Sequence, residues 1–324
     1  TTLINFAEKI SSFSSPLAVG MSGNFRQMKR RILNIAVFRK ETLYQKMRAL
    51  IIYLVISAVF IGCTPILSVD ASTQSVYHFS DTDKNISLLD ISETFGTYDG
   101  SFVLYDNNLD SWKIYDLEEA TKRIPPESTY KIYDALLGLE SGIITPEHSS
   151  MTWNGDAFPF PSWEADQDLN SAMQNSVNWY FQAIDSQLGI NRVQEFLNKI
   201  EYGNQTTSSN LDLYWSDFSL KISPLEQVTL LKKFNTNEFH LNSQNVFSVK
   251  NAIKIASTPN GNFYGKTGTG RVNGQDINGW FIGYVETSDN SYYFATNIQS
   301  DSNATGKKAF EITSDILKKL HIWN

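Results

Sequence analysis

Ser128 and Lys131 form a Ser-x-x-Lys pair that can carry out nucleophilic chemistry. Pro125 and Pro126 precede the pair and an apolar run follows it, so the sequence predicts a helix that begins here. Residues three apart on a helix share one face. A serine hydroxyl needs a base to take its proton, and a lysine amine is that base only when its pKa is depressed. Alone the pair is a weak signal, because it also fits a surface serine and a solvated lysine.

Three further motifs follow Ser128 along the chain. They are Ser176-Val177-Asn178, Tyr202-Gly203-Asn204 and Lys266-Thr267-Gly268-Thr269-Gly270. Ser-x-x-Lys, Ser-x-Asn and Lys-Thr-Gly in this order predict a serine that attacks acyl-D-Ala-D-Ala-like amides, including β-lactams.

Residues of three of these motifs have an expected task in that chemistry. Lys131 accepts the proton of Ser128, and Ser176 relays a proton between Lys131 and the leaving nitrogen. The backbone N–H groups of Ser128 and Thr269 are expected to form an oxyanion hole.

The Lys-Thr-Gly segment allows two interpretations. In the serine site it supplies a cation and hydroxyls to the ligand carboxylate through Lys266, Thr267, Gly268 and Thr269. A phosphate-binding loop also contains Gly-Lys-Thr, but it needs glycine where this chain has Asn260, and it needs a helix next. Gly268 and Gly270 oppose such a helix, so we favour the serine site.

Apolar periodicity and turn residues predict the elements that hold these motifs. The predicted elements are a hairpin of Ser101–Tyr105 and Trp112–Tyr115, helices from Ser128 to about Gly142, Leu169–Leu188, Arg192–Ile200, Ser223 to Lys233 and Asn245–Ile255, strands Phe263–Thr267, Trp280–Val285 and Tyr292–Ile298, and a closing helix Gly306–Leu320. This order indicates an α+β fold, in which helices flank an antiparallel sheet and a helical subdomain is inserted.

Composition excludes several other classes of function. The 324 residues carry a formal net charge of −7, which argues against a nucleic-acid partner. A single cysteine, Cys63, rules out an intrachain disulfide. The four histidines are scattered without metal-ligand spacing, so we predict no metal site.

The first part of the chain has the pattern of a membrane protein. Residues 1–48 carry nine lysines and arginines against two glutamates, and Ala49–Leu67 then runs uncharged for 19 residues. A helix of that length spans roughly 28 Å, close to the hydrocarbon thickness. We predict a transmembrane helix, with a buried core helix or a lipoprotein cleavage site at Phe60–Cys63 as alternatives. The basic flank predicts residues 1–48 in the cytoplasm and the chain after residue 67 outside, with residues 68–98 as a linker.

Residues 99–324 resemble class D β-lactamases, and more closely the extracellular sensor domain of BlaR/MecR-type β-lactam receptors. The resemblance is carried by Gly100–Asp106, Ser128–Tyr133, Gln174–Phe181, Tyr202–Asn204, Leu220–Val228, Tyr264–Gly270 and Asn278–Tyr284. It implies a serine β-lactamase/transpeptidase-like fold with a five-stranded antiparallel sheet. It also implies that penicillins and cephalosporins acylate Ser128, and that the long-lived adduct signals across the membrane to induce resistance. Residues 1–67 resemble the end of the receptor's membrane-embedded zinc-protease region and its last transmembrane helix. The protease motif of the family is absent, so a metalloprotease domain upstream is expected to be missing from this chain.

One residue separates receptor from hydrolase. Class D hydrolases usually place valine where this chain has Asn178, and there the base lysine carries a CO2-derived carbamate in an apolar pocket. Asn178 makes the pocket of Lys131 polar, so little turnover is expected. Trp215 resembles the tryptophan that steadies the carbamate. We expect no cofactor, apart from a possible CO2-derived carbamate on Lys131. A membrane-tethered class D β-lactamase and a D,D-transpeptidase remain alternative functions.

Overall fold

The computed structural model describes residues 75–80, 82 and 84–324, which lie in a compact unit that begins at Asp70. The predicted basic segment 1–48 and the predicted transmembrane segment 49–67 lie outside the described residues. Within the described part of the chain, no helix is long and apolar enough to cross a membrane.

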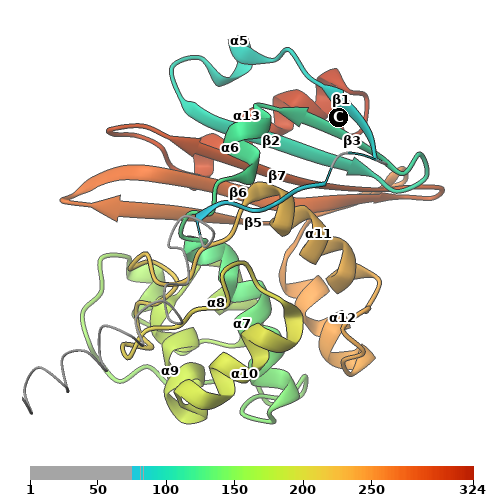
Figure 1. Cartoon of the computed structure of the whole chain (residues 1–324). Coiled ribbons are helices and arrows are strands. Elements are labelled where there is room, and N and C mark those ends of the chain that lie inside the picture. Colours follow the sequence, from blue (N-terminus) through green and yellow to red (C-terminus); the bar gives the residue numbers. More distant parts are fainter. Residues whose placement is uncertain (1–74, 81, 83) are drawn as a thin grey trace, which may run out of the picture. The chain divides into compact units, whose positions relative to one another are not determined.

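A seven-stranded sheet is the centre of this unit (Figure 1). Its order is β1-β3-β2-β7-β6-β5-β4, and every neighbouring pair is antiparallel except β1 and β3, which are parallel. The strands are β1 Asn85–Leu88, β2 Asp99–Asp106, β3 Ser111–Tyr115, β4 Lys254–Thr258, β5 Gly261–Val272, β6 Gln275–Thr287 and β7 Ser291–Gln299.

The expected five-stranded antiparallel sheet is therefore wrong at both edges. β1 comes from the segment assigned to the linker, and β4 overlaps the end of a predicted helix. Both strands are short and mostly exposed, so neither has the buried alternation that marks a strand in sequence. β1 and β4 form because their partners β3 and β5 offer unpaired backbone N–H and C=O groups for hydrogen bonding.

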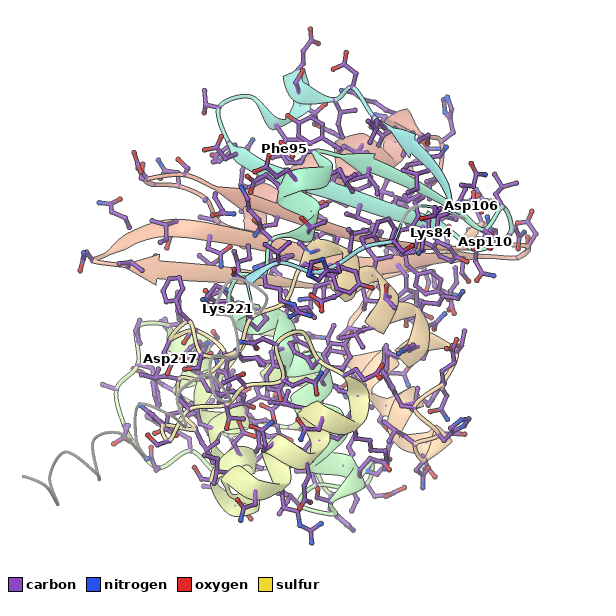
Figure 2. The ribbon with its side chains drawn as sticks, viewed as in Figure 1. Lys84, Phe95, Asp106, Asp110, Asp217 and Lys221 are labelled. Atoms are coloured by element: carbon purple, nitrogen blue, oxygen red, sulfur yellow. The ribbon has the colours of Figure 1, made fainter. Side chains whose placement is uncertain are left out.

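The predicted hairpin is confirmed as β2 and β3, which pair from Phe102 with Tyr115 to Asp106 with Ser111. Asp106 Oδ1 accepts backbone hydrogen bonds of 3.2 Å from Asn108 and from Leu109, which closes the turn. The turn lies at one end of the sheet (Figure 2). Asx-type bonds of this kind explain why the Asn/Asp cluster marked it in the sequence.

Both faces of the sheet are covered, so its central strands are apolar on both sides. In β2, Phe102 and Leu104 enter one core, whereas Val103 and Tyr105 enter the other. The first core packs against α13 Gly306–Lys319 and α5 Ser92–Phe95, and the second faces the helical block (Figure 1). A sheet clamped in this way is a rigid base for the motif on β5.

The helical block carries the remaining motifs. A short helix, α6 Leu117–Thr121, leads from the sheet into this block. The elements of the block are the 3-10 turn η2 Glu127–Tyr130, α7 Lys131–Glu140, the 3-10 turn η3 Pro161–Trp163, α8 Leu169–Gln174, α9 Asn178–Leu188, α10 Ile190–Ile200, α11 Pro224–Asn235 and α12 Ser243–Ala252. The capping box of α11 is confirmed, because Ser223 Oγ accepts from Glu226 N at 3.3 Å and the Glu226 carboxylate accepts from Ser223 N at 3.0 Å.

The single helix predicted for Leu169–Leu188 is wrong, because the chain breaks between α8 and α9. Ser176 adopts φ 56°, in the left-handed region that a helix cannot include. The indole of Trp163 donates a 3.0 Å hydrogen bond to Asn175 O, and the indole of Trp179 donates one of 2.9 Å to Trp163 O. These hydrogen bonds, which involve Trp163 of a separate segment, stabilise the interruption between the two helices. Apolar periodicity does not predict such contacts.

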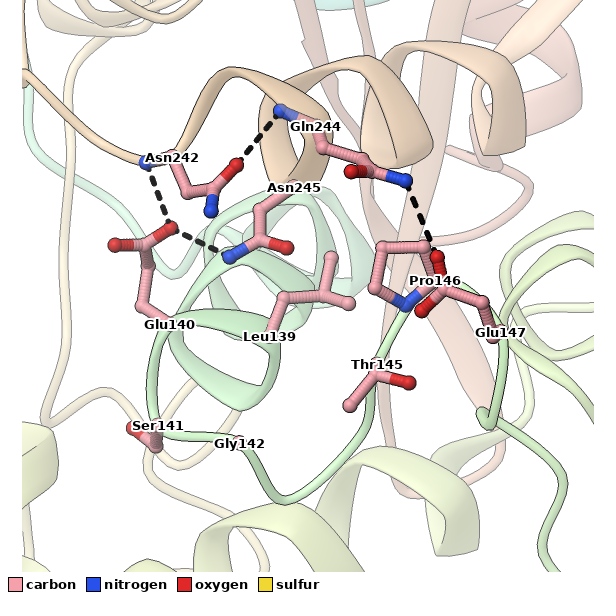
Figure 3. Close-up of a pocket in the computed structure, with 10 residues that line it drawn as sticks. All are labelled: Leu139, Glu140, Ser141, Gly142, Thr145, Pro146, Glu147, Asn242, Gln244 and Asn245. Carbon is pink, nitrogen blue, oxygen red and sulfur yellow. Dashed lines mark hydrogen bonds between the residues drawn. The ribbon is translucent and has the colours of Figure 1, made fainter.

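The end of α7 that lies away from Ser128 is fixed to α12. Glu140 accepts hydrogen bonds from Asn242 N at 3.0 Å and from Asn245 Nδ2 at 2.7 Å, as Figure 3 shows. Gln244 Nε2 donates to Glu147 across the same shallow polar pocket of about 520 Å³. The η2 turn that leads into α7 packs against β5, so α7 is held at both ends.

Candidate active site

Ser128 lies one residue after the buried Glu127 in the η2 turn, and this turn leads directly into α7. Thr129 Oγ1 donates to Pro126 O at 2.6 Å, and Gln227 Nε2 donates to Thr129 Oγ1 at 3.0 Å. The first hydrogen bond closes the turn, and the second connects it to α11. Lys131 Nζ lies 2.7 Å from Ser128 Oγ, so the predicted pair shares one face at the start of the helix.

The amine of Lys131 is enclosed. The residue is 1% exposed, and its Nζ lies 5.7 Å from the ring centre of Phe181 and 5.8 Å from that of Trp215. Burial lowers the pKa of Lys131 well below its usual range, and the charge of Lys266 lowers it further. A neutral amine has a lone pair, which is what a base beside Ser128 needs.

The break between α8 and α9 brings the second motif to this amine. Asn178 Oδ1 accepts a 2.7 Å hydrogen bond from Lys131 Nζ. Ser176 Oγ accepts a 2.9 Å hydrogen bond from Lys266 Nζ. The left-handed conformation of Ser176 thus lets Ser176 and Asn178, two positions apart, contact two different lysines.

Lys266 on β5 is as deeply enclosed as Lys131. It is 5% exposed, and burial lowers its pKa to about 7. Its Nζ also donates to Thr267 O at 3.0 Å. Lys266 and Thr267 border a pocket of about 360 Å³ beside β5, whose other walls include Gln174 and Lys254.

Two glycines allow β5 to pass against the Ser128 turn. A Cβ on Gly268 would lie 3.1 Å from Pro126 O and 3.2 Å from Ser128 N, and a Cβ on Gly270 would collide with the Glu127 carboxyl. Thr269 lies between these glycines on the same strand. The strand therefore approaches Ser128 N at Gly268, the residue directly before Thr269.

The structure also shows what the Thr269 hydroxyl and the Tyr202-Gly203-Asn204 motif contact within the protein. Thr269 Oγ1 accepts a 2.9 Å hydrogen bond from Gly306 N at the start of α13, so this hydroxyl already has a structural partner. The Tyr202-Gly203-Asn204 motif does not join the two lysines. Asn204 Nδ2 donates to Ser219 O at 2.7 Å, and the Tyr202 ring packs 5.2 Å from Tyr130 behind the turn.

Sequence reasoning missed two residues beside the nucleophile. Glu127 is buried next to Ser128, and Asn278 on β6 donates to Glu127 Oε1 at 3.2 Å and to Pro125 O at 3.1 Å. The Trp280 indole donates to the same Pro125 carbonyl at 2.8 Å. An acid directly before the motif serine was visible in the sequence, but its partner lies 151 residues away.

Comparisons with known proteins agree with this geometry. Residues 96–318 match the family described as penicillin binding protein transpeptidase domain. Regulatory protein BlaR1 of Bacillus licheniformis is 42% identical over 99% of this chain and 53% of its own length, so the chain spans about half of that relative. The solved C-terminal domain of the Bacillus licheniformis BlaR penicillin-receptor is 45% identical, with a TM-score of 0.73 over 75% of this chain and 99% of that domain. Class D β-lactamase BAT-2 is 36% identical, with a TM-score of 0.69 over 73% of this chain and 97% of its own.

Proposed function

Because this chain belongs to the penicillin-binding protein transpeptidase domain family, in the group of BlaR/MecR-type sensors, we propose that β-lactam antibiotics acylate it at Ser128. The observation that carries the proposal is the chain of contacts from Ser128 Oγ to Lys131 Nζ to Asn178 Oδ1, each 2.7 Å long. It places a buried amine with a lowered pKa directly beside a serine hydroxyl.

Acylation follows from these positions. The lone pair of Lys131 takes the proton of Ser128 as Oγ attacks the β-lactam carbonyl carbon. The N–H groups of Ser128 and Thr269 stabilise the oxyanion. As the ring C–N bond breaks, the leaving nitrogen takes the proton that Lys131 holds, and the Ser176 hydroxyl, which contacts Lys266, is the expected relay. Lys266 in its charged form, with Thr267, binds the ligand carboxylate.

The adduct persists because the amine of Lys131 is poorly suited to the second step. A carbamate on Lys131 would carry negative oxygens beside Nζ, where Asn178 presents the carbonyl oxygen Oδ1. The residues around Lys131 therefore fit an amine better than a carbamate. Without a strong base for the deacylating water, hydrolysis is slow and the acylated domain acts as a receptor.

A second candidate function is a class D hydrolase with the same residues. It is favoured by the 36% identity to BAT-2 and by Trp215, whose ring lies beside Lys131 as a carbamate-steadying tryptophan would. The two functions differ in the lifetime of the acyl adduct.

Intact mass spectrometry with excess benzylpenicillin over several hours tests the function. We expect one penicilloyl adduct that persists after free drug is removed, and none in Ser128→Ala. Labelling that survives Ser128→Ala would contradict the assignment of the nucleophile. Rapid return to the unmodified mass would favour the hydrolase.

For the longer protein we propose a membrane receptor whose C-terminal domain faces outward. The support is the uncharged segment Ala49–Leu67 after a basic flank, together with the likeness to BlaR1. Acylation would change how this domain contacts the rest of the receptor, and a metalloprotease domain upstream would be the output.

A further inference from the structure

Glu127 is a buried acid that the acylation chemistry does not use. It is 6% exposed, and it adopts φ 52°, an uncommon conformation for a residue with a side chain. Its backbone N–H donates to Trp215 O at 3.1 Å, which orients the residue inward. Among the described residues, the carboxyl receives one side-chain hydrogen bond, the 3.2 Å contact from Asn278 Nδ2.

The carboxyl of Glu127 borders both halves of the proposed oxyanion hole. Its chain neighbour is Ser128, which supplies one N–H group. Across the gap, its Cβ lies 3.1 Å from where a Cβ on Gly268 would be, and its Oε1 lies against Gly270. Thr269, which supplies the other N–H group, is the residue between these two glycines.

A negative charge at this place would oppose the reaction. The transition state of acylation develops a negative oxygen between the N–H groups of Ser128 and Thr269, and charges interact strongly where water is excluded. Burial raises the pKa of Glu127 to about 8, against the Asn278 hydrogen bond and the charge of Lys131, which lower it. The neutral acid therefore predominates at neutral pH.

The charged and titratable groups around Glu127 are few. On α7, Lys131 opposes the rise of its pKa, and Asp134 follows one turn later. On β5, Lys266 points to Ser176. On β6 the facing residue is the neutral Asn278, and the pair Arg271–Asp276 lies at the exposed end of the β5–β6 hairpin.

We propose that Glu127 is a positioning residue for acylation, whose neutral carboxyl braces the Ser128 turn against β5 and β6 and whose ionised carboxylate slows attack. The brace runs from Glu127 through Asn278 to Asn297, whose Nδ2 donates to Asn278 Oδ1 at 2.8 Å. The proposal rests on the proposed acylation of Ser128 and adds an alkaline limit to it.

The test compares limiting acylation rates of the whole chain in detergent micelles, at saturating benzylpenicillin and between pH 6 and pH 9. Saturation removes the effect of Lys266 on binding of the ligand carboxylate. For Glu127→Gln, which keeps an oxygen for Asn278 but cannot ionise, we expect the ratio of its rate to the wild-type rate to rise with pH, by up to about tenfold over this range. The control Glu195→Gln, on the exposed face of α10, should keep a constant ratio.

A ratio for Glu127→Gln that stays constant or falls as the pH rises would overturn the proposal, whatever the rate at pH 6. If that variant does not fold, Glu127→Ala gives the same comparison of ratios, although its rate at every pH should be lower because the brace to Asn278 is lost. Absence of an adduct on Ser128 in the wild-type chain would instead overturn the proposed function.

Discussion

The chemistry of Lys131 is set by its immediate neighbours more than by its own type. Exposed lysines keep their charge near neutral pH, but burial and the charge of Lys266 lower the pKa of Lys131. Asn178 then takes one of its N–H groups. Removing this amide and removing the buried acid Glu127 are the two residue-scale changes with the clearest expected outcomes.

Asn178→Val should increase turnover of β-lactams, because an apolar side chain replaces the carbonyl oxygen beside Lys131 and no longer opposes a carbamate there. We expect steady-state nitrocefin hydrolysis with added bicarbonate to rise at least about tenfold, which corresponds to about 1.4 kcal/mol of barrier. Nuclear magnetic resonance with ¹³C-bicarbonate should show a carbamate signal in this variant. Asn251→Val, an exposed control on α12, should behave as wild type, and a variant at position 178 no faster than wild type would contradict the role given to Asn178.

Glu127→Gln should stabilise the domain at alkaline pH. The pKa of Glu127 is about 8 in the folded chain and 4.5 ordinarily, so the folded state binds its proton more tightly. Stability from this group is complete below pH 4.5 and is lost as the pH rises through 8. The difference in Tm between the variant and wild type should therefore grow by roughly 3 °C or more between pH 5 and pH 8.5. A difference that does not change with pH in thermal unfolding would show that Glu127 is not buried as an acid.

At the scale of elements, the site depends on how closely β5 approaches the η2 turn. Gly268 and Gly270 have no side chains on the face toward Glu127 and Ser128, so the strand backbone reaches the turn. On the other side of β5, Thr269 Oγ1 is bonded to the first N–H of α13. The strand is thus held from both faces, and a small displacement would separate the two N–H groups of the proposed oxyanion hole.

Gly268→Ala tests this approach. The added Cβ would lie 3.1 Å from Pro126 O and 3.2 Å from Ser128 N, so the strand or the turn must shift by a few tenths of an ångström. We expect the acylation rate to fall at least about tenfold while Tm changes little, because the shift acts at the reacting centre.

Gly142→Ala is the matched control for that substitution. It places a side chain at φ 72° with nothing within 4 Å, so it should cost stability without slowing acylation. A Gly268→Ala chain that acylates at the wild-type rate would contradict the close approach of β5.

At the scale of the whole molecule, the described part of the chain is one domain in which both faces of the sheet are covered. The described residues, 75–80, 82 and 84–324, belong to one compact unit. Its acidic balance contrasts with the nine basic residues in the first 48. The uncharged segment Ala49–Leu67 lies between this basic stretch and the serine domain, so the side of the membrane on which the domain lies depends on the orientation of that segment.

Protease protection on intact protoplasts should show residues 99–324 cut by added protease and residues 1–48 protected. The reason is the positive-inside rule, applied to the basic flank before Ala49–Leu67. Permeabilised protoplasts, in which both parts become accessible, are the control. The opposite pattern, with residues 1–48 cut and residues 99–324 resistant, would contradict both the orientation and the receptor proposal.

The sequence by itself determined the features that depend on a few neighbouring residues. Ser128 and Lys131 share a face because they are three apart, and Ser223 and Glu226 cap α11 because a capping box acts over three residues. The turn at Asp106 follows from bonds two and three residues long. The order of predicted strands and helices also indicated an α+β fold.

Tertiary structure alone decided what those residues can do. Asn178 meets Lys131 only because Trp163 and Trp179 hold a break that apolar periodicity had predicted as continuous helix. The edge strands β1 and β4 formed where partners offered unpaired backbone, and Glu127 found Asn278 from 151 residues away. Burial and hydrogen bonds between distant elements exist only after packing, and they set the pKa of each acid and amine at the site.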